Sequence, residues 1–76
     1  MKLATGTRVG IGAGDYCYLV TMTSGTCSLA LDIEDSAAQQ ITDFSFTANA
    51  NGIVTLPSGY ITATLTGDAT LHLNIV

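Results

Sequence analysis

The sequence predicts a small all-β domain, built as an antiparallel β-sandwich or a small barrel. Twelve of the 76 residues are threonine, and valine, isoleucine and leucine are frequent, which favours strands. Turn-forming pairs such as Ser24-Gly25 recur at short intervals. Between the turns, apolar and polar residues alternate with the period of a half-buried strand. We expect residues 1–76 to form a single domain.

A first hairpin is predicted over residues 16–33, with Ser24-Gly25 as its two-residue turn. In this register Val20 lies opposite Leu29, and the other residues of that face are also apolar or aromatic. The second face is mixed to polar. A slip of one residue would exchange the two faces, so the match across the turn supports this pairing.

Residues 44–76 are predicted to form a four-stranded meander. Its pairing gives one continuous apolar face and a second face that is rich in threonine. Such a polar face can contact water or another subunit. The predicted turns lie at residues 50–52, 57–60 and 67–69.

Residues 34–40, between the hairpin and the meander, have no strand pattern. Ser36 followed by Gln39 fits a capping box, so we expect one helical turn or a structured loop. This segment is predicted to carry the chain from one sheet to the other.

Residues 1–15 are predicted to form a glycine-rich extended arm or edge strand that precedes the β core of residues 16–76. The segment 9–15 has some likeness to a phosphate-binding loop. However, a dinucleotide fingerprint needs a third glycine where Asp15 stands, and it needs a helix after it. No cofactor site is therefore expected.

The two cysteines are predicted to remain free. In the hairpin register Cys17 and Cys27 point to opposite faces and lie about 16 Å apart along the ladder, at about 3.3 Å per residue. A disulfide needs Cα atoms within about 7 Å of each other. We expect Cys27 to be part of the core and Cys17 to lie on the second face or at an interface.

No catalytic or metal-binding residues are predicted. His72 is the only histidine, it is expected across from Thr64, and a lone histidine in a strand more often lies at a surface or interface than in a catalytic site. Asp32, Glu34 and Asp35 are the only carboxylate cluster, and they lack the spacing of a calcium loop. We expect a solvated turn there.

The scarcity of charge excludes nucleic acid as a partner. Two basic and six acidic residues give a net charge of −4, whereas nucleic-acid binding uses clustered lysine and arginine. Anionic membranes are disfavoured for the same reason. No apolar run approaches the roughly 20 residues that cross a bilayer, and the first residues lack the apolar region of a signal peptide. We expect a soluble, cytoplasmically made product.

A chain of this length buries only a small core, so a further source of stability is expected. With neither a disulfide framework nor a metal motif, association with other subunits is the favoured source. Tyr60, beside a turn on the threonine face, is the best candidate for a contact residue. The full set of candidate interface residues is Arg8, Val9, Ile11, Tyr60, Thr62, Thr64 and His72.

In size, in its richness in threonine, glycine and alanine, and in its poverty of lysine and arginine, the chain resembles the small β-rich accessory proteins of bacteriophage particles. The stretches Tyr60–Thr66 and Ala69–Val76 carry this resemblance to decoration, cement or head-fibre proteins. It implies location on the virion, where such proteins bind the outer capsid surface and brace neighbouring shell subunits, commonly as trimers.

Two other classes of function remain open. A carbohydrate- or peptide-binding β-module would need an exposed aromatic platform, and only Tyr60 qualifies. A small enzyme would need a constellation of catalytic residues that the chain does not suggest.

Overall fold

The computed structural model describes all residues 1–76 and contains eight β-strands and no helix. The strands form two four-stranded sheets that pack face to face, so the predicted all-β sandwich is confirmed and a closed barrel is not formed. The strands are β1 (Lys2–Leu3), β2 (Arg8–Ile11), β3 (Gly14–Thr21), β4 (Gly25–Asp32), β5 (Gln39–Phe46), β6 (Ala50–Leu56), β7 (Gly59–Gly67) and β8 (Thr70–Ile75).

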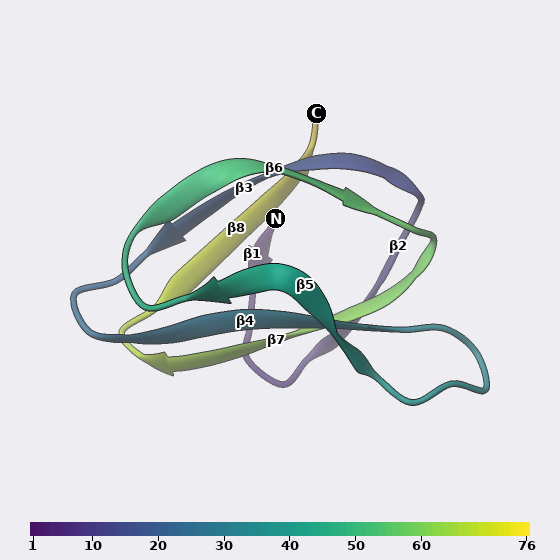
Figure 1. Ribbon diagram of the computed structural model, residues 1–76, viewed down its shortest axis with the longest axis horizontal. Coiled ribbons are helices and arrows are strands. Elements are labelled where there is room, and N and C mark those ends of the chain that lie inside the picture. Colours follow the sequence, from purple (N-terminus) through teal and green to yellow (C-terminus); the bar gives the residue numbers. More distant parts are fainter.

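The strand order is that of a jelly roll. Sheet A has the order β1-β8-β3-β6, sheet B has the order β2-β7-β4-β5, and neighbouring strands are antiparallel throughout. The chain therefore changes sheet at every connection except that from β4 to β5 (Figure 1). Eight antiparallel strands shared between two sheets in this way define the double-sheet jelly roll.

The ladders β2–β7, β3–β6 and the part of β4–β5 beside the tip belong to one long hairpin that bends at Asp35. Tyr16 pairs with Val54 and Leu31 pairs with Gln39, and each pair is centred on residue 35. The β2–β7 ladder has the same centre. Asp35 itself has a φ of 64°, a left-handed conformation that reverses the chain direction.

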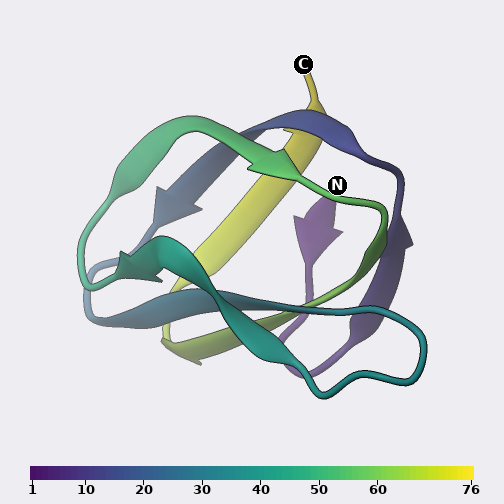
Figure 2. The same ribbon diagram turned by 45° about the vertical axis from the view of Figure 1, so that its right-hand side comes forward.

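The tip of the long hairpin projects from the sandwich (Figure 2). It is a structured loop rather than a helical turn. The Ser36 hydroxyl donates to the Ile33 carbonyl over 2.8 Å and accepts from the Ile33 amide over 2.9 Å. The prediction that residues 34–40 connect the two sheets is wrong, because they join β4 to β5 within sheet B.

The predicted hairpin of residues 16–33 is not formed. Val20 pairs with Ala50 in sheet A, whereas Leu29 pairs with Ala63 in sheet B. Both Val20 and Leu29 are nevertheless fully buried, because both side chains point into the space between the sheets. The alternation identified most inward residues correctly, with Ile33, which is 51% exposed, as the exception. It cannot distinguish a neighbour on the adjacent strand from one on the facing sheet.

The connection from β3 to β4 crosses between the sheets because side chains bind its backbone. The Met22 amide donates to Oδ1 of Asn49 over 2.8 Å. The Thr23 and Ser24 amides donate to Oδ1 of Asp68 over 2.9 and 3.0 Å. These amides therefore do not form a tight hairpin turn, and the hydrogen bonds from Ser24 and Thr23 lower the pKa of Asp68.

The predicted meander over residues 44–76 is wrong in its pairing but largely right in its faces. The expected turn at residues 50–52 lies inside β6, and β7 pairs with β2 and β4 rather than with β6 or β8. Leu56, Ile61 and Leu71 point into the core as expected. The facing sheet again replaces the neighbouring strand as the apolar partner.

The N-terminal residues form the two edge strands on one side of the sandwich, β1 in sheet A and β2 in sheet B. Gly6, with a φ of 76°, lies in the connection between them, and its amide donates to the Ala63 carbonyl over 2.9 Å. The Thr5 hydroxyl accepts from the Leu65 amide over 3.0 Å. These bonds hold the segment against β7.

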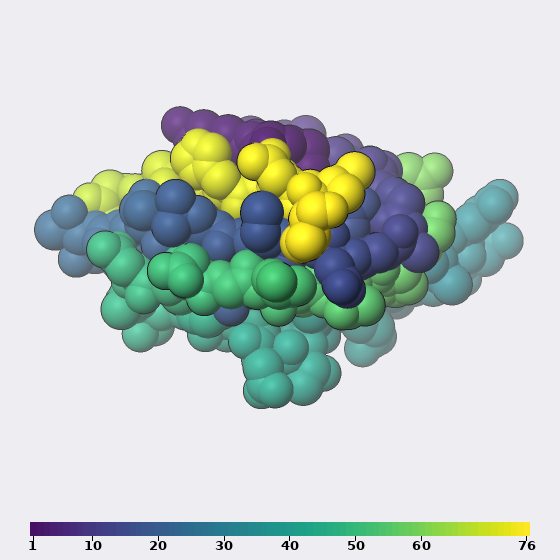
Figure 3. All heavy atoms as spheres, turned by 90° about the horizontal axis from the view of Figure 1, so that it is seen from above, coloured from purple at the N-terminus to yellow at the C-terminus, as the bar shows by residue number.

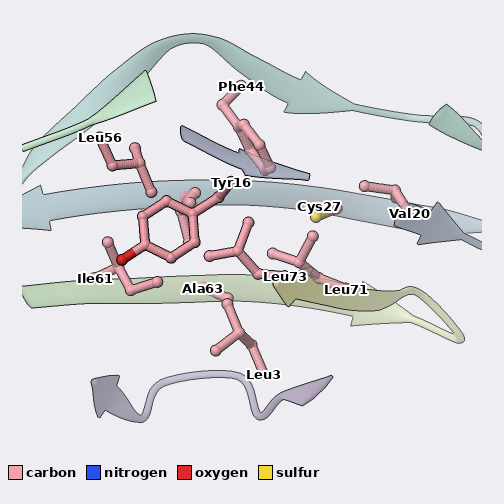
Figure 4. Packing of buried hydrophobic residues seen from close by; sticks show 11 residues of the cluster. Leu3, Tyr16, Val20, Cys27, Phe44, Leu56, Ile61, Ala63, Leu71 and Leu73 are labelled. Atoms are coloured by element: carbon pink, nitrogen blue, oxygen red, sulfur yellow. The ribbon is translucent and has the colours of Figure 1, made fainter. Parts of the chain in front are cut away.

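The core lies between the sheets and contains no buried polar side chain apart from the hydroxyl of Tyr16 (Figure 4). That hydroxyl donates to the Gly12 carbonyl over 2.6 Å. The meander prediction placed Ile75 on the apolar face opposite Ile61, but Ile75 is 79% exposed at the end of β8. The eleven buried residues are Leu3, Tyr16, Val20, Cys27, Leu29, Phe44, Leu56, Ile61, Ala63, Leu71 and Leu73.

A bulge in β5 turns Phe44 into the core. The β4–β5 register shifts between Ser28 and Ala30, so that β5 contains extra residues at this point. Asp43, in the bulge, has a φ of 63°. The Gln40 side-chain amide donates to the Phe44 carbonyl over 2.8 Å, which satisfies a backbone group that the ladder leaves free.

Three aromatic rings fill the side of the sandwich between β3 and β5. Tyr18 lies edge-on to Phe44, with ring centroids 4.9 Å apart, and it stacks on Phe46 at 5.5 Å. Gly52, the β6 partner of Tyr18, leaves room for the ring, since a Cβ there would lie 2.9 Å from the tyrosine oxygen. A side chain at position 52 would displace the aromatic cluster.

Substitution of Val20 by aspartate is expected to unfold the protein. Val20 is fully buried, and an unpaired carboxylate in the core costs several kcal/mol, which is comparable to the whole stability of a small domain. Thr21→Asp is the matched control, because Thr21 is exposed and contacts only the Thr70 hydroxyl through its side chain. Circular dichroism and thermal unfolding measure both variants, and equal losses would contradict the assignment of faces.

Acidification is expected to weaken the attachment of Asp68 to residues 23–24. Because the pKa of Asp68 is lowered in the folded state, its ionised form stabilises the fold above the usual aspartate pKa of about 3.9. That stabilisation is lost as the pH falls through the lowered value. The melting temperature of wild type should exceed that of Asp68→Asn at pH 7, and the difference should shrink below about pH 4. A difference that does not change with pH would contradict this role.

Candidate functional site

The outer face of sheet B is polar and carries a charged cluster at one end. Nε and one terminal nitrogen of Arg8 donate to Oδ2 of Asp32 over 3.0 and 2.6 Å. The guanidinium carbon lies 3.6 Å from the centroid of the Tyr60 ring. The hydrogen bond with Asp32 raises the pKa of Arg8. The cluster therefore joins β2, β7 and β4 across the sheet.

Tyr60 is enclosed within this cluster. Its ring lies beside Gly10, its partner on β2, where a Cβ would lie 3.5 Å from the ring. Arg8 covers the ring from the other side. Tyr60 is 39% exposed, but the guanidinium covers one face of its ring. The arrangement weighs against Tyr60 as an aromatic platform.

The rest of this face is formed by hydroxyl side chains. Thr62 and Thr64 of β7 continue the row from Tyr60. Thr26 and Thr66 pair across the ladder, with their hydroxyl oxygens 2.7 Å apart. Ala30, which pairs with Thr62, adds only one small apolar group to this surface.

The structure separates the candidate interface residues into three groups. Arg8, Tyr60, Thr62 and Thr64 come together on the outer face of sheet B. Val9 and Ile11, on the other face of β2, are half-buried against the core.

His72 lies on the outer face of sheet A, on the opposite side of the sandwich. It pairs with Lys2 and Leu19, not with Thr64 as expected from the sequence. The expected pairing required β7 and β8 to be neighbours, and they belong to different sheets.

The outer face of sheet A carries an exposed apolar patch formed by Leu19, Cys17 and Ile53. Figure 3 looks onto this sheet, where purple, yellow, blue and green bands follow the order β1, β8, β3 and β6. Leu19 is 47% exposed and Ile53 is 64% exposed. Cys17 pairs directly with Ile53, and Leu19 follows two residues later on the same face of β3. The three side chains are therefore contiguous.

Polar side chains surround the apolar patch. His72 and Asn74 of β8 lie on one side, opposite Leu19 and Cys17 respectively. Asn51 lies on the other side. At one end, the Thr55 hydroxyl donates to Asp15 over 2.7 Å. A small apolar centre with a polar rim has the composition of a protein–protein contact.

Sequence reasoning missed this patch, although a signal was present. Leu19 stands between Tyr18 and Val20, and Ile53 stands before Val54, so each is an apolar residue at an outward position of its strand. An apolar side chain out of phase with the core pattern is such a signal. The predicted hairpin and meander placed the two residues in different parts of the fold, so they were not connected.

The surface has shallow hollows but no deep cleft. The hollow with the largest volume, about 560 Å³, lies between the tip of the long hairpin and the connection from β6 to β7. Its lining includes Leu31, Ile33 and Pro57, together with Ser36 and Gln39. No cysteine or histidine lines it.

Of the predicted carboxylate cluster, Asp32 is paired with Arg8, while Glu34 and Asp35 are exposed at the hairpin tip. No group of three histidine, cysteine, aspartate or glutamate side chains is arranged to hold a metal ion. No helix has the length and apolar character to cross a bilayer.

Both cysteines are free, and their environments differ. Cys27 is fully buried, and burial raises the pKa of its thiol. Cys17 is exposed in the apolar patch. The prediction of a core Cys27 and an outward, unbridged Cys17 is confirmed.

Comparison with known proteins finds no family model, no curated protein and no solved structure that matches this chain.

The two thiols are expected to react at very different rates. In the native protein, a thiol reagent such as DTNB should modify one cysteine per chain quickly, because only Cys17 is exposed. The second should react only after unfolding in guanidinium. Cys17→Ser should abolish the fast reaction with DTNB, and Cys27→Ser should leave the fast reaction unchanged. Two fast thiols in the native protein would contradict the burial of Cys27.

Proposed function

We propose that the chain is a structural assembly module that attaches to a larger protein assembly through the outer face of sheet A. The observation that carries this proposal is the apolar patch of Leu19, Cys17 and Ile53 on a flat sheet face. Exposed apolar groups gain free energy when a partner removes them from water. The strands below hold them in a fixed geometry, so little entropy is lost on docking.

The specific role that we propose is that of a virion decoration or cement protein, which stabilises a capsid by binding neighbouring subunits. Two observations support it. The sequence resembles small accessory proteins of bacteriophage particles in its composition. The jelly-roll order is also used by viral capsid proteins, although lectins and cupins share it.

The docking surface differs from the one expected from sequence. Of the candidate interface residues, only His72 lies at the rim of the apolar patch. On the face of Arg8, Tyr60, Thr62 and Thr64, the charge of Arg8 is already paired with Asp32, so a partner would gain less free energy from binding it. The alternative, a carbohydrate- or peptide-binding module, is less well supported, because Arg8 covers one face of the Tyr60 ring that would serve as its aromatic platform.

The test is whether the chain travels with particles. A tagged chain is produced together with the candidate virion, and particles are separated on a density gradient. The wild-type chain should band with capsids. Leu19→Asp should reduce the bound amount by about tenfold or more, because a carboxylate then enters the apolar contact. Thr64→Asp, an exposed strand position on sheet B, is the matched control and should bind as wild type does.

Two outcomes would contradict the proposal. One is a chain that stays at the top of the gradient, away from every particle. The other is equal binding by Leu19→Asp and Thr64→Asp, which would remove the outer face of sheet A from the contact.

A further inference from the structure

Strand β6 is an edge of sheet A, and the ladder shows which of its peptide groups are free. The Val76 amide donates to the Asp15 carbonyl, so the peptide groups of odd-numbered residues of β3 point toward β8. The even-numbered residues of β3 therefore bond to β6. Their partners on β6 are also even-numbered, as in the pair of Tyr16 with Val54. The amides and carbonyls of Asn51, Ile53 and Thr55 consequently point away from the sheet.

The other three edges of the sandwich have features that discourage strand pairing. β1 is only two residues long. β2 is four residues long and includes Arg8 and Gly10. β5 is bent by its bulge, where Asp43 adds a charge and a left-handed backbone. Short strands, charges and bulges are the common means of protecting an edge.

β6 has none of these features. It has seven residues, Ala50–Leu56, with no charged residue, no proline and no bulge in its pairing with β3. Ile53 at its centre is the most exposed large apolar residue outside the C-terminal end of β8. An edge of this kind is a template for another strand.

We propose that two copies of the chain pair antiparallel through β6, with the two-fold axis beside Ile53. Pairing would join the two copies of sheet A into one eight-stranded sheet. The inference deepens the proposed function, on which its biological meaning rests, by naming a second copy as a partner. Closed two-fold association of this kind is the commonest form of oligomer.

The occupant is a second copy because β6 is complementary to itself. When Ile53 pairs with Ile53 of the other copy, Asn51 lies opposite Thr55, and each outward amide meets an outward carbonyl. β6 carries no charge, so the two paired strands bring no like charges together. Figure 3 shows β5 (teal) projecting past β6 (green) on this side, so the added strand would also cover part of β5.

Pairing would also change the docking surface. The two apolar patches would lie on the same side of the joined sheet and meet at Ile53. The dimer would then present two copies of the patch in a fixed relation. Two linked contacts bind a repetitive surface far more strongly than one, without any new type of contact.

Ile53→Pro is the decisive variant. The Ile53 amide points outward, so proline removes a donor from the dimer without removing a bond from the β3–β6 ladder. Ile53→Thr is the matched control, because it keeps the amide and the strand propensity. Asn51→Pro removes a second outward amide and serves as the test if Ile53→Pro does not fold. Sedimentation equilibrium over a range of concentrations measures association, and thermal unfolding checks each fold.

The wild-type chain should sediment with twice its monomer mass, and Ile53→Thr should still dimerise. Ile53→Pro should weaken dimerisation by about tenfold or more, because two interchain hydrogen bonds are lost, one from each copy. A wild-type monomer, a trimer, or equal dimerisation by folded Ile53→Pro and Ile53→Thr would overturn the inference. A monomer that still bands with particles would overturn only this inference, whereas a dimer that binds no particle would overturn only the proposed function.

Discussion

The whole structure depends on one antiparallel register, centred on the hairpin tip at Asp35. The ladders β3–β6 and β2–β7 share this centre with the part of β4–β5 between the tip and the bulge, so the two halves of the chain run side by side in the two sheets. A slip in one ladder would turn its inward residues outward. The pairs of β3 with β6 and of β2 with β7 join residues far apart in sequence. Such non-local pairing is associated with slow folding.

Wrapping of this long hairpin requires close packing between large and small residues. Gly52 accommodates Tyr18 on the inner side of sheet A, and Gly10 accommodates Tyr60 on the outer side of sheet B. In each case the glycine is the strand partner of the tyrosine. The glycines of a strand-rich sequence therefore mark places where an aromatic ring crosses a neighbouring strand, as well as turns.

The two outer faces differ in what they leave unsatisfied. On sheet B, Arg8 bonds with Asp32, and the hydroxyls of Thr26 and Thr66 bond with each other. On sheet A, Leu19 and Ile53 remain exposed, and the β6 edge adds free backbone groups beside them. On sheet A, exposed apolar side chains and free backbone groups thus lie side by side. This asymmetry is the physical reason why we propose the outer face of sheet A as the contact surface.

The sequence by itself determined the fold class, most of the inward residues and the free state of both cysteines, because alternation within one strand is a local property. Only the tertiary structure decided which strands are neighbours. Inward residues such as Val20 and Leu29 show the same pattern whether they meet across a ladder or across the core. The side chains of Asn49 and Asp68, which bind the backbone of residues 22–24, direct the chain to the second sheet. The apolar patch joins β3 to β6, so it too depends on that choice.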